Sequence, residues 1–508
     1  MGGDAAVEQT TQRERIAMKM PCKALVCAIA VLIAGCMVGP NYHRPSVPMP
    51  AEYKELPGWS VAAPAADAPK GEWWTAFNDP LLDELEPKVS VSNQTVAQDY
   101  ANYQQALAEV QVARSALFPV IGIAGSATRQ RTATDNTGTV GTVGTVGAVG
   151  VSPIGSRGVV TAGSLEGTAS WAPDLWGAVR RNIQESKATA QASAATLANA
   201  TLSEQTALAT AVIELRISDS NIELYKKTVD AYTEYLRVVT NQGKAGTAAP
   251  SDVITARTQL ANTQSSLIAL GVARAQYAHA IAVLVGKNPE DLEIAQSTHV
   301  PDMPSVPAAM PSGLLQRRPD IAVAERQMAA ANAAIGVAEA AYYPTLSLSA
   351  ADGFSQSPLA GLIHAANHVW SLGADADETL FQGGLTHAQV AAAQAAYEAS
   401  VANYRATVLK ALQNVEDDLA GLRILGQQNA VLESAVSDAT RGAEIAFNEY
   451  RAGTVDYTTA ANAQAAQLSS QETLLGVKQQ RLLDAVSLIG DLGGGWSSSN
   501  RDPPASGR

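Results

Sequence analysis

Residues 408–422 read VLKALQNVEDDLAGL, and their apolar side chains recur at alternating steps of four and three residues. The repeating positions are Val408, Leu412, Val415, Leu419 and Leu422. The stretch belongs to a longer segment, 385–451, without proline and with few glycines. As a helix this segment would rise roughly 100 Å, at about 1.5 Å per residue. Such a seam needs partner helices and supercoils with them, so the sequence predicts long helices in a thin wall.

The same pattern occurs earlier in the chain, and the two copies align without a gap at an offset of 207 residues. Gly246-Thr247 pairs with Gly453-Thr454 and Gly286 pairs with Gly493. A single offset held over about 110 residues predicts an internal duplication. The first copy has 18 extra residues around the low-complexity stretch 138–158, which we interpret as a lengthened, mobile loop.

Each copy is expected to contain a helix, two strands and a helical hairpin. The first copy covers 88–286, with strands at about 120–130 and 163–172 and a hairpin over 178–285. The second covers 319–493, with strands at about 345–353 and 369–378 and a hairpin over 385–492. The remaining segments are a signal peptide at 1–35, an N-terminal segment at 36–87, a linker at 287–318 and a tail at 494–508.

An N-terminal apolar run indicates that the chain is targeted for secretion. Lys19 and Lys23 precede or adjoin a run over 24–34 that is too short to span a bilayer, as in a secretory signal peptide. We expect the chain to start at Met18 or Met20. The alternative to a signal peptide is that the apolar run forms a short buried helix. The run ends in Ile-Ala-Gly-Cys36, which resembles the bacterial lipobox, so we expect a covalent lipid such as palmitate on Cys36.

Composition excludes several classes of site and function. All three cysteines lie within the first 36 residues, so disulfides, thiolate metal sites and cysteine nucleophiles are excluded from the body. The net charge of −13 argues against a nucleic-acid partner, because a protein that binds nucleic acid needs a basic face. The mean hydropathy of −0.01 argues against a polytopic helical membrane protein.

The predicted strands alternate between an apolar and a polar face, as half-buried strands do. We expect a set of polar residues to face a water-filled pore: Ser164, Glu166, Thr168, Asp375 and Asp377. Trp171 and Trp370 share the apolar faces and suit an aromatic girdle at a membrane interface. The alternative is a small soluble sheet.

Four strands per chain cannot enclose a lumen, and lipid cannot satisfy free sheet edges. Three chains would supply twelve strands and twelve helical segments, which predicts a homotrimer. The fold class expected is therefore an α+β membrane protein with a 12-stranded β-barrel continuous with a 12-helix α-barrel.

Several motifs together carry a family resemblance. They are GCMVGPNYHRP (35–45), GEWWTAFNDPLLDEL (71–85), PDLWG (173–177), the run from LLQRRPD to PTLSLS (314–349), LFQGG (380–384) and YRAGTVDY (450–457). The chain resembles the TolC superfamily of outer-membrane channels, most closely the OprM/NodT-type lipoproteins of resistance-nodulation-division (RND) multidrug efflux systems.

The resemblance implies a trimer whose barrel spans the outer membrane of a Gram-negative cell, with the helices in the periplasm and an equatorial mixed α/β belt between them. It implies a passive exit duct that docks onto a periplasmic adaptor and an inner-membrane RND transporter, with outer-membrane lipid around it. Neither catalysis nor a cofactor is implied. The competing hypothesis is a periplasmic coiled-coil lipoprotein that acts as a structural spacer or adhesin stalk.

The resemblance also places a gate at the periplasmic tip, where both Gly-Thr turns, at Gly246-Thr247 and Gly453-Thr454, reverse the helices. It pairs Tyr450 with Asp252 as a clasp that holds the closed state; the alternative is that Asp252 only caps its helix. At the constriction, where relatives place a leucine and an aspartate, this chain has Thr458 and Asn462. Val455 stands where relatives place a basic residue. From these three departures together we expect a more neutral, leakier gate.

Candidate chemistry elsewhere is weak. His364 and His368 have a spacing that could hold a metal ion on a helix. Because they lie between two predicted strands, we expect them in an exposed loop, and no metal site is predicted. No phosphate-binding loop, nucleophile elbow or HExxH motif is present, which makes an enzyme the least favoured class.

Overall fold

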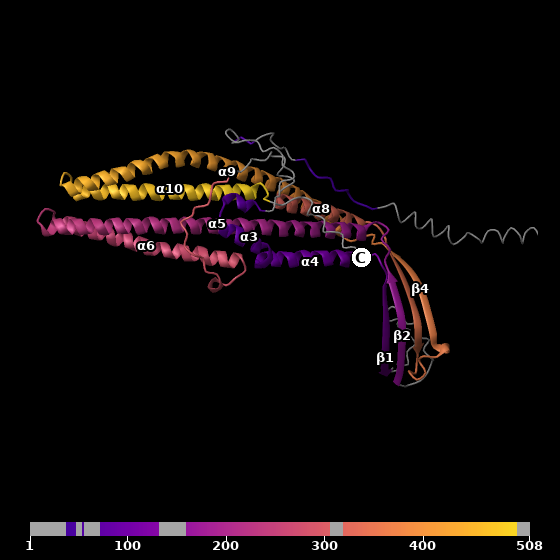
Figure 1. Ribbon diagram of the computed structural model, residues 1–508. Coiled ribbons are helices and arrows are strands. Elements are labelled where there is room, and N and C mark those ends of the chain that lie inside the picture. The colour runs from indigo at the N-terminus through magenta and orange to yellow at the C-terminus, as the bar shows by residue number, and fades with distance from the viewer. Residues whose placement is uncertain (1–36, 47–52, 55–71, 132–158, 305–317, 495–508) are drawn as a thin grey trace, which may run out of the picture. The chain divides into compact units, whose positions relative to one another are not determined.

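The computed structural model describes residues 37–46, 53–54, 72–131, 159–304 and 318–494 (Figure 1). The chain divides into two compact units. The strand unit comprises Met1–Tyr42, Glu109–Ser186 and Ala331–Ala396, and the helical unit comprises His43–Ala108, Lys187–Ala330 and Tyr397–Arg508. Each unit is described by itself below.

The strand unit contains one antiparallel sheet of four strands in the order β1-β2-β3-β4 (Figure 1). The strands are β1 (Val120–Arg131), β2 (Val159–Trp171), β3 (Thr345–Gln356) and β4 (His368–Asp377). β2 begins four residues before its predicted start, and β3 continues three residues past its predicted end. Among the residues that the structure describes, β1 and β4 each pair on one side only, so the sheet has two open edges.

Seven α-helices contain most of the other described residues. They are α3 (Pro80–Ser92), α4 (Gln94–Ser115), α5 (Ala178–Lys244), α6 (Pro250–Leu284), α8 (Pro319–Ala340), α9 (Leu385–Ala452) and α10 (Tyr457–Asp491), with short 3-10 turns η1 (Trp73–Phe77), η2 (Pro289–Asp291) and η3 (Ala365–Asn367). The first residues of α9 and α10 lie 207 positions after those of α5 and α6. By length and composition, one described helix, α6, is apolar enough to cross a membrane.

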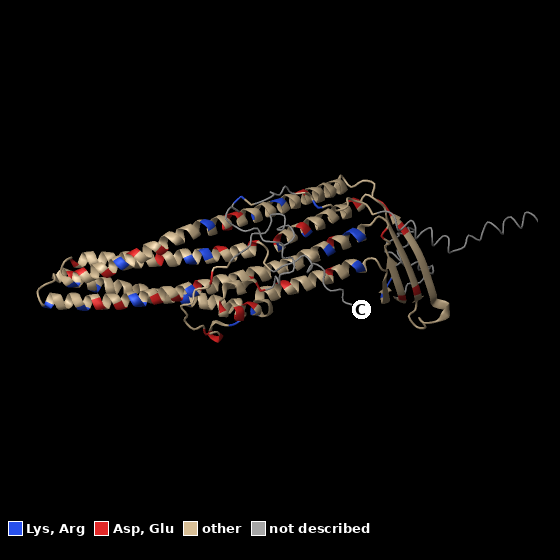
Figure 2. Ribbon diagram, turned by 45° about the horizontal axis from the view of Figure 1, so that its top comes forward, with Lys and Arg blue, Asp and Glu red and all other residues tan. Residues whose placement is uncertain are grey.

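The helical unit is held together by narrow apolar seams. In α9, Val408, Val415 and Leu419 are fully buried, whereas Leu412 is only partly buried. In α5, Leu208, Val212 and Leu215 are fully buried at the same alternating spacing. Acidic and basic residues are interspersed along the helices (Figure 2), so no described helix presents a long face of one charge.

A buried ion pair joins α3 to α5 within the helical unit. The Asp79 carboxylate caps α3 by accepting from the backbone N–H groups of Leu81 and Leu82, and the Arg216 Nε donates to its second oxygen at 2.8 Å. Burial alone would raise the pKa of Asp79, but the hydrogen bonds and charge of Arg216 hold that pKa below its ordinary value. Losing either partner would leave a buried charge uncompensated.

Candidate channel surface and helical gate

The strand register sorts the expected pore residues onto one side of the sheet. Glu166 pairs with Gly353 of β3, and Asp375 pairs with Ser347 of the same strand. Because Gly353 and Ser347 are an even number of residues apart, Glu166 and Asp375 project from the same face. By alternation that face also holds Ser164, Thr168 and Asp377, and the Ser164 and Ser126 hydroxyls lie 2.9 Å apart on it.

The two expected interface tryptophans lie on the opposite face, at different levels. Trp171 pairs with Leu348 and Trp370 pairs with Asp352, four residues further along β3, which is about 13 Å at the usual rise per residue. Ile121, Ile123 and Leu372 share this face and are strongly exposed in the single chain. The face is therefore an apolar surface bounded by aromatic rings.

A hydrogen bond between His368 and Asp352 on this apolar face was not expected from the sequence. His368 is the first residue of β4 rather than part of a loop, and its Nε2 lies 2.8 Å from Asp352 Oδ1. Asp352 is two and four residues after Ala350 and Leu348 on β3, so the three side chains lie on the same face. The position of Asp352 on the apolar face could therefore have been predicted from the sequence. His364 lies in the connection before η3.

Both helical hairpins turn through the same capping geometry, and both turns lie at one end of the helical unit (Figure 1). Gly246 and Gly453 have φ of 77° and 76°, which favours glycine. The backbone N–H of Thr247 donates to Gln242 O, and that of Thr454 donates to Glu449 O. Each threonine hydroxyl donates to the same carbonyl as its own N–H, which explains why threonine follows glycine in both turns.

The predicted clasp between Asp252 and Tyr450 is not formed. The Tyr450 hydroxyl is buried and has no hydrogen-bond partner among the described residues. Asp252 lies in the first turn of α6, where its charge suits the helix N-terminus. Its carboxylate accepts a hydrogen bond from the Ser251 hydroxyl at 3.4 Å. Burial raises the pKa of Tyr450, and the nearby Asp252 charge raises it further, so the phenol stays neutral. Asp252 does not cap α6 through a hydrogen bond either, because the N-cap position is Ala249 and no side chain caps it, so the carboxylate acts on the helix through its charge alone.

Other residues join the two hairpins instead. The Tyr235 hydroxyl of α5 donates to Gln464 Oε1 of α10 at 2.7 Å. Tyr457 of α10 donates to Gln259 Oε1 of α6 at 3.4 Å, and the Gln259 amide donates to Tyr232 at 2.8 Å. Further along, Tyr225 of α5 donates to the Glu472 carboxylate of α10. We call these three links, Tyr225–Glu472, Tyr235–Gln464 and Gln259–Tyr457, the inter-hairpin ladder.

Aromatic packing reinforces the ladder near the turns. The rings of Tyr235 and Phe447 stack at 3.9 Å, and those of Tyr450 and Tyr457 meet edge to face at 5.6 Å. Tyr450 and Tyr457 belong to an apolar cluster that includes Val239, Ala256 and Ala460, and Phe447 packs against it. Burial raises the pKa of Tyr235 and of Tyr457 to about 12, so both hydroxyls remain donors at physiological pH.

The expected constriction residues project away from this cluster. Tyr457, Ala460 and Ala461 of α10 are buried, whereas Thr458 and Asn462 are exposed. The exposed stripe continues through uncharged residues: Ala465, Ser469 and Thr473. This side of α10 is therefore polar but uncharged for several turns.

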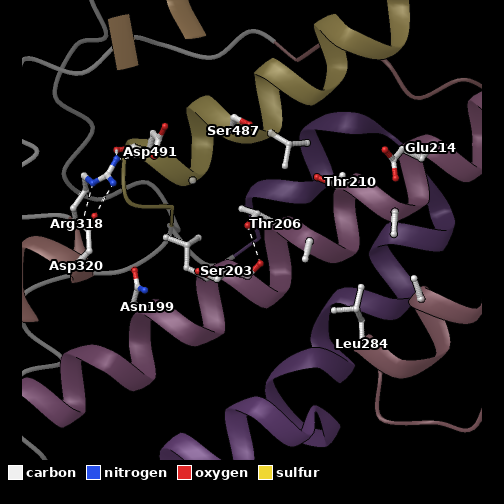
Figure 3. Close-up of a pocket in the computed structure, with 16 residues that line it drawn as sticks. Asn199, Ser203, Thr206, Thr210, Glu214, Leu284, Arg318, Asp320, Ser487 and Asp491 are labelled. Atoms are coloured by element: carbon white, nitrogen blue, oxygen red, sulfur yellow. Dashed lines mark hydrogen bonds and ion pairs between the residues drawn. The ribbon is translucent and has the colours of Figure 1, made fainter. Parts of the chain in front are cut away.

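A polar pocket of about 680 Å³ lies within the helical unit, between α5, α6, α10 and the start of α8 (Figure 3). Arg318 sits at one side, where its guanidinium donates to Asp491 Oδ1 and to Asp320 Oδ2, both at 2.7 Å. Glu214 lines the other side, and burial raises the pKa of its carboxyl. Arg318 and Asp320 thus begin α8 and tie it to the end of α10.

Two expectations concern residues outside the described ranges. The lipidation site Cys36 and the low-complexity stretch 138–158 both fall there. Among the described residues, no group of three or more His, Cys, Asp or Glu side chains is arranged to hold a metal ion.

Known proteins resemble this chain over nearly its whole length. The outer membrane efflux protein family matches residues 87–287 and 310–494. The probable efflux pump outer membrane protein TtgC of Pseudomonas putida is 28% identical over 471 residues, covering 92% of this chain and 94% of TtgC. Nodulation protein T of Rhizobium leguminosarum is 28% identical, covering 90% and 92%. The structure of the outer-membrane channel OprN covers 91% of this chain and 100% of OprN, with a TM-score of 0.82 and 27% identity.

Proposed function

Since this chain belongs to the outer membrane efflux protein family, we propose that it is the exit duct of a tripartite RND-type pump. In this role the duct passively conducts drugs or other small molecules from the periplasm to the exterior. A periplasmic adaptor and an inner-membrane RND transporter complete the pump, and the transporter supplies the energy. The relatives are channel components of efflux pumps, which favours a duct over a structural stalk.

The observation that carries this proposal is a sheet with one apolar face, one polar face and two open edges. A lipid-embedded sheet must close on itself because hydrocarbon cannot satisfy free N–H and C=O groups. Three copies joined edge to edge give a 12-stranded barrel, with Glu166 and Asp375 toward the lumen. The helices of the three copies then form the 12-helix α-barrel, with a mixed belt around it.

Membrane anchoring follows the same proposal. Residues 1–35 direct secretion, and acyl chains on Cys36 add a second hold on the outer membrane beside the barrel. Acyl chains gain about 0.8 kcal/mol per buried CH₂, so two or three chains on one residue make a stable anchor.

The gate in this proposal is the tip of the helical unit. The inter-hairpin ladder holds the second hairpin against the first in the closed state. Thr458 and Asn462 line the narrowest part, and the uncharged stripe of α10 makes that constriction neutral. Adaptor binding opens it by shifting the second hairpin.

The test is conductance in a planar bilayer. The purified protein is expected to be a trimer that resists extraction by urea from membranes and conducts ions. Asn462→Asp is expected to raise cation selectivity and sensitivity to multivalent cations, because it adds a ring of three carboxylates. Asn448→Asp, at an exposed position of α9 near the same turn, is the matched control and should change selectivity less.

The outcomes separate the parts of the proposal. A protein that neither trimerises nor conducts is not an exit duct. A conducting trimer in which Asn462→Asp leaves selectivity and block unchanged is still a duct, but its constriction lies elsewhere.

A further inference from the structure

The apolar face of the sheet carries two arginines at the end that lies away from the α-helices. α4 and α8 lead into β1 and β3, and β2 and β4 lead into α5 and α9, so all four α-helices join the sheet at one end. At the other end β1 finishes with Arg129 and Arg131. Both are an even number of residues from Ile123, so their side chains project from the apolar face, and both residues are exposed.

The height of these arginines matches one border of a membrane. Trp171 follows Ser170, which pairs with Val120, so the level of Trp171 lies ten residues before Arg129 along β1. At about 3.3 Å per residue and a strand tilt of 35–45°, the two levels are about 25 Å apart across the membrane. This is about the height of the apolar band of an outer-membrane barrel. Trp171 therefore marks the border near the helices, and Arg129 marks the opposite border.

A groove of about 460 Å³ lies on the apolar face between these two levels. Its floor contains the small residues Gly167 and Ala169 of β2 and Ala350 of β3. Ile121 of β1 lines it on one side and Trp370 of β4 on the other, because β1 and β4 are the outer strands of the sheet. Small residues between two larger ones leave a depression that an acyl chain fits.

We propose that the apolar face binds an anionic, phosphate-bearing lipid of the outer leaflet, with its headgroup on Arg129 and Arg131 and one acyl chain in the groove. The proposal rests on the trimeric barrel proposed above, in which the end of the sheet away from the α-helices faces the exterior. Gly167 pairs with Ile123, six residues before Arg129. At the same tilt this is about 15 Å across the membrane, which is the depth of one leaflet, so a single lipid reaches both parts.

The charges on this face select an anionic headgroup. The Cα atoms of Arg129 and Arg131 are about 7 Å apart on one strand, and each guanidinium can donate two parallel hydrogen bonds to a phosphate. Among the described strand residues of this face, the remaining acidic group is Asp352, whose carboxylate is hydrogen-bonded to His368. The chain as a whole carries a net charge of −13, so attraction of an anion depends on this local pair of arginines.

Native mass spectrometry of the detergent-solubilised trimer tests the site. The probes are dimyristoyl phosphatidylglycerol, which is anionic, and dimyristoyl phosphatidylcholine, which has the same chains and no net charge. We expect retention of one phosphatidylglycerol for each chain of the trimer. Arg129→Gln with Arg131→Gln should lower the affinity for phosphatidylglycerol roughly tenfold or more, because charge-assisted hydrogen bonds are lost, and should leave phosphatidylcholine binding unchanged.

Two further variants separate charge from shape. Arg405→Gln with Lys410→Gln removes the same charge from exposed positions of α9 and should leave phosphatidylglycerol retention unchanged. Gly167→Ile fills the floor of the groove and should lower that retention although no charge changes. The added Cβ would lie 3.7 Å from the Asp352 carbonyl oxygen, an ordinary contact distance, so the strand accommodates it.

The outcomes distinguish failure of the site from failure of the duct. If the trimer retains both lipids equally, or if the arginine variant and the α9 control behave alike, the arginines do not recognise a headgroup. If added inorganic phosphate displaces the lipid and stays bound itself, the site takes a free anion and the lipid proposal is wrong. If the protein is not a trimer, the proposed duct itself fails.

Discussion

At the scale of single residues, Glu86 of the helical unit has a buried carboxyl group whose hydrogen-bonding capacity is not satisfied. It is fully buried on α3, and neither carboxylate oxygen has a hydrogen-bond partner among the described residues. Burial raises its pKa to about 9, so the folded chain keeps a proton that the unfolded chain releases near pH 4.5. Stability from this group is complete below pH 4.5 and falls as pH rises toward 9.

Glu86→Gln should remove that pH dependence, because an amide does not ionise. We expect the variant to be more stable than the parent at pH 7 by about 3 kcal/mol, and little changed at pH 4.5. Urea unfolding at pH 5, 7 and 9 measures this. Glu84→Gln, at an exposed position on the same helix, is the control and should shift stability by less than about 1 kcal/mol. Parallel pH profiles for parent and Glu86→Gln would contradict the assignment.

At the scale of elements, the two hairpins are rigid rods linked by a few side-chain contacts. Tyr225 and Tyr235 project from α5 to Glu472 and Gln464 of α10, which are eight residues apart. The links therefore follow one side of α10 over about two turns. Because they join the hairpins at more than one level, they resist sliding and splaying of the second hairpin together.

Tyr235→Phe should weaken the closed state while keeping the stacked ring. A hydrogen bond of this kind contributes about 1 kcal/mol, so we expect roughly a fivefold rise in open probability for each link lost, and more when all three copies open together. Single-channel recording measures it, with Tyr225→Phe as the second variant. Tyr100→Phe, at an exposed position on α4, is the control. Unchanged opening in both ladder variants would show that the gate is held by other contacts.

At the scale of the whole molecule, a single chain is incomplete. Its described residues leave two sheet edges unpaired and large apolar residues exposed on β1, β4, α6 and α9. Unpaired sheet edges are costly in water and in lipid alike, and apolar faces of this extent are costly in water. Folding and association are therefore expected to be one process.

The midpoint of unfolding should consequently rise with protein concentration, because the folded state is an oligomer and the unfolded state is not. Urea unfolding of the detergent-solubilised protein over a hundredfold range of concentration measures it. A midpoint independent of concentration, in a sample whose mass is that of a single chain, would mean that the monomer is stable by itself.

The amino-acid sequence by itself determined the elements and the family. The helix spans follow from apolar spacing, and the turns at Gly246 and Gly453 follow from a glycine with positive φ before a threonine. Alternation placed Glu166 and Asp375 on polar faces before any register was known. All of these depend on neighbours along the chain, which is why local patterns were sufficient.

Only the tertiary structure decided which side chains meet. It left Tyr450 without the expected partner Asp252, joined Tyr235 to Gln464, and buried Glu86. Tyr235 and Gln464 are 229 residues apart, so their contact depends on the relative rotation and height of two hairpins. Periodicity fixes which face of a helix is apolar, but small shifts between packed helices decide which polar atoms come within hydrogen-bonding distance.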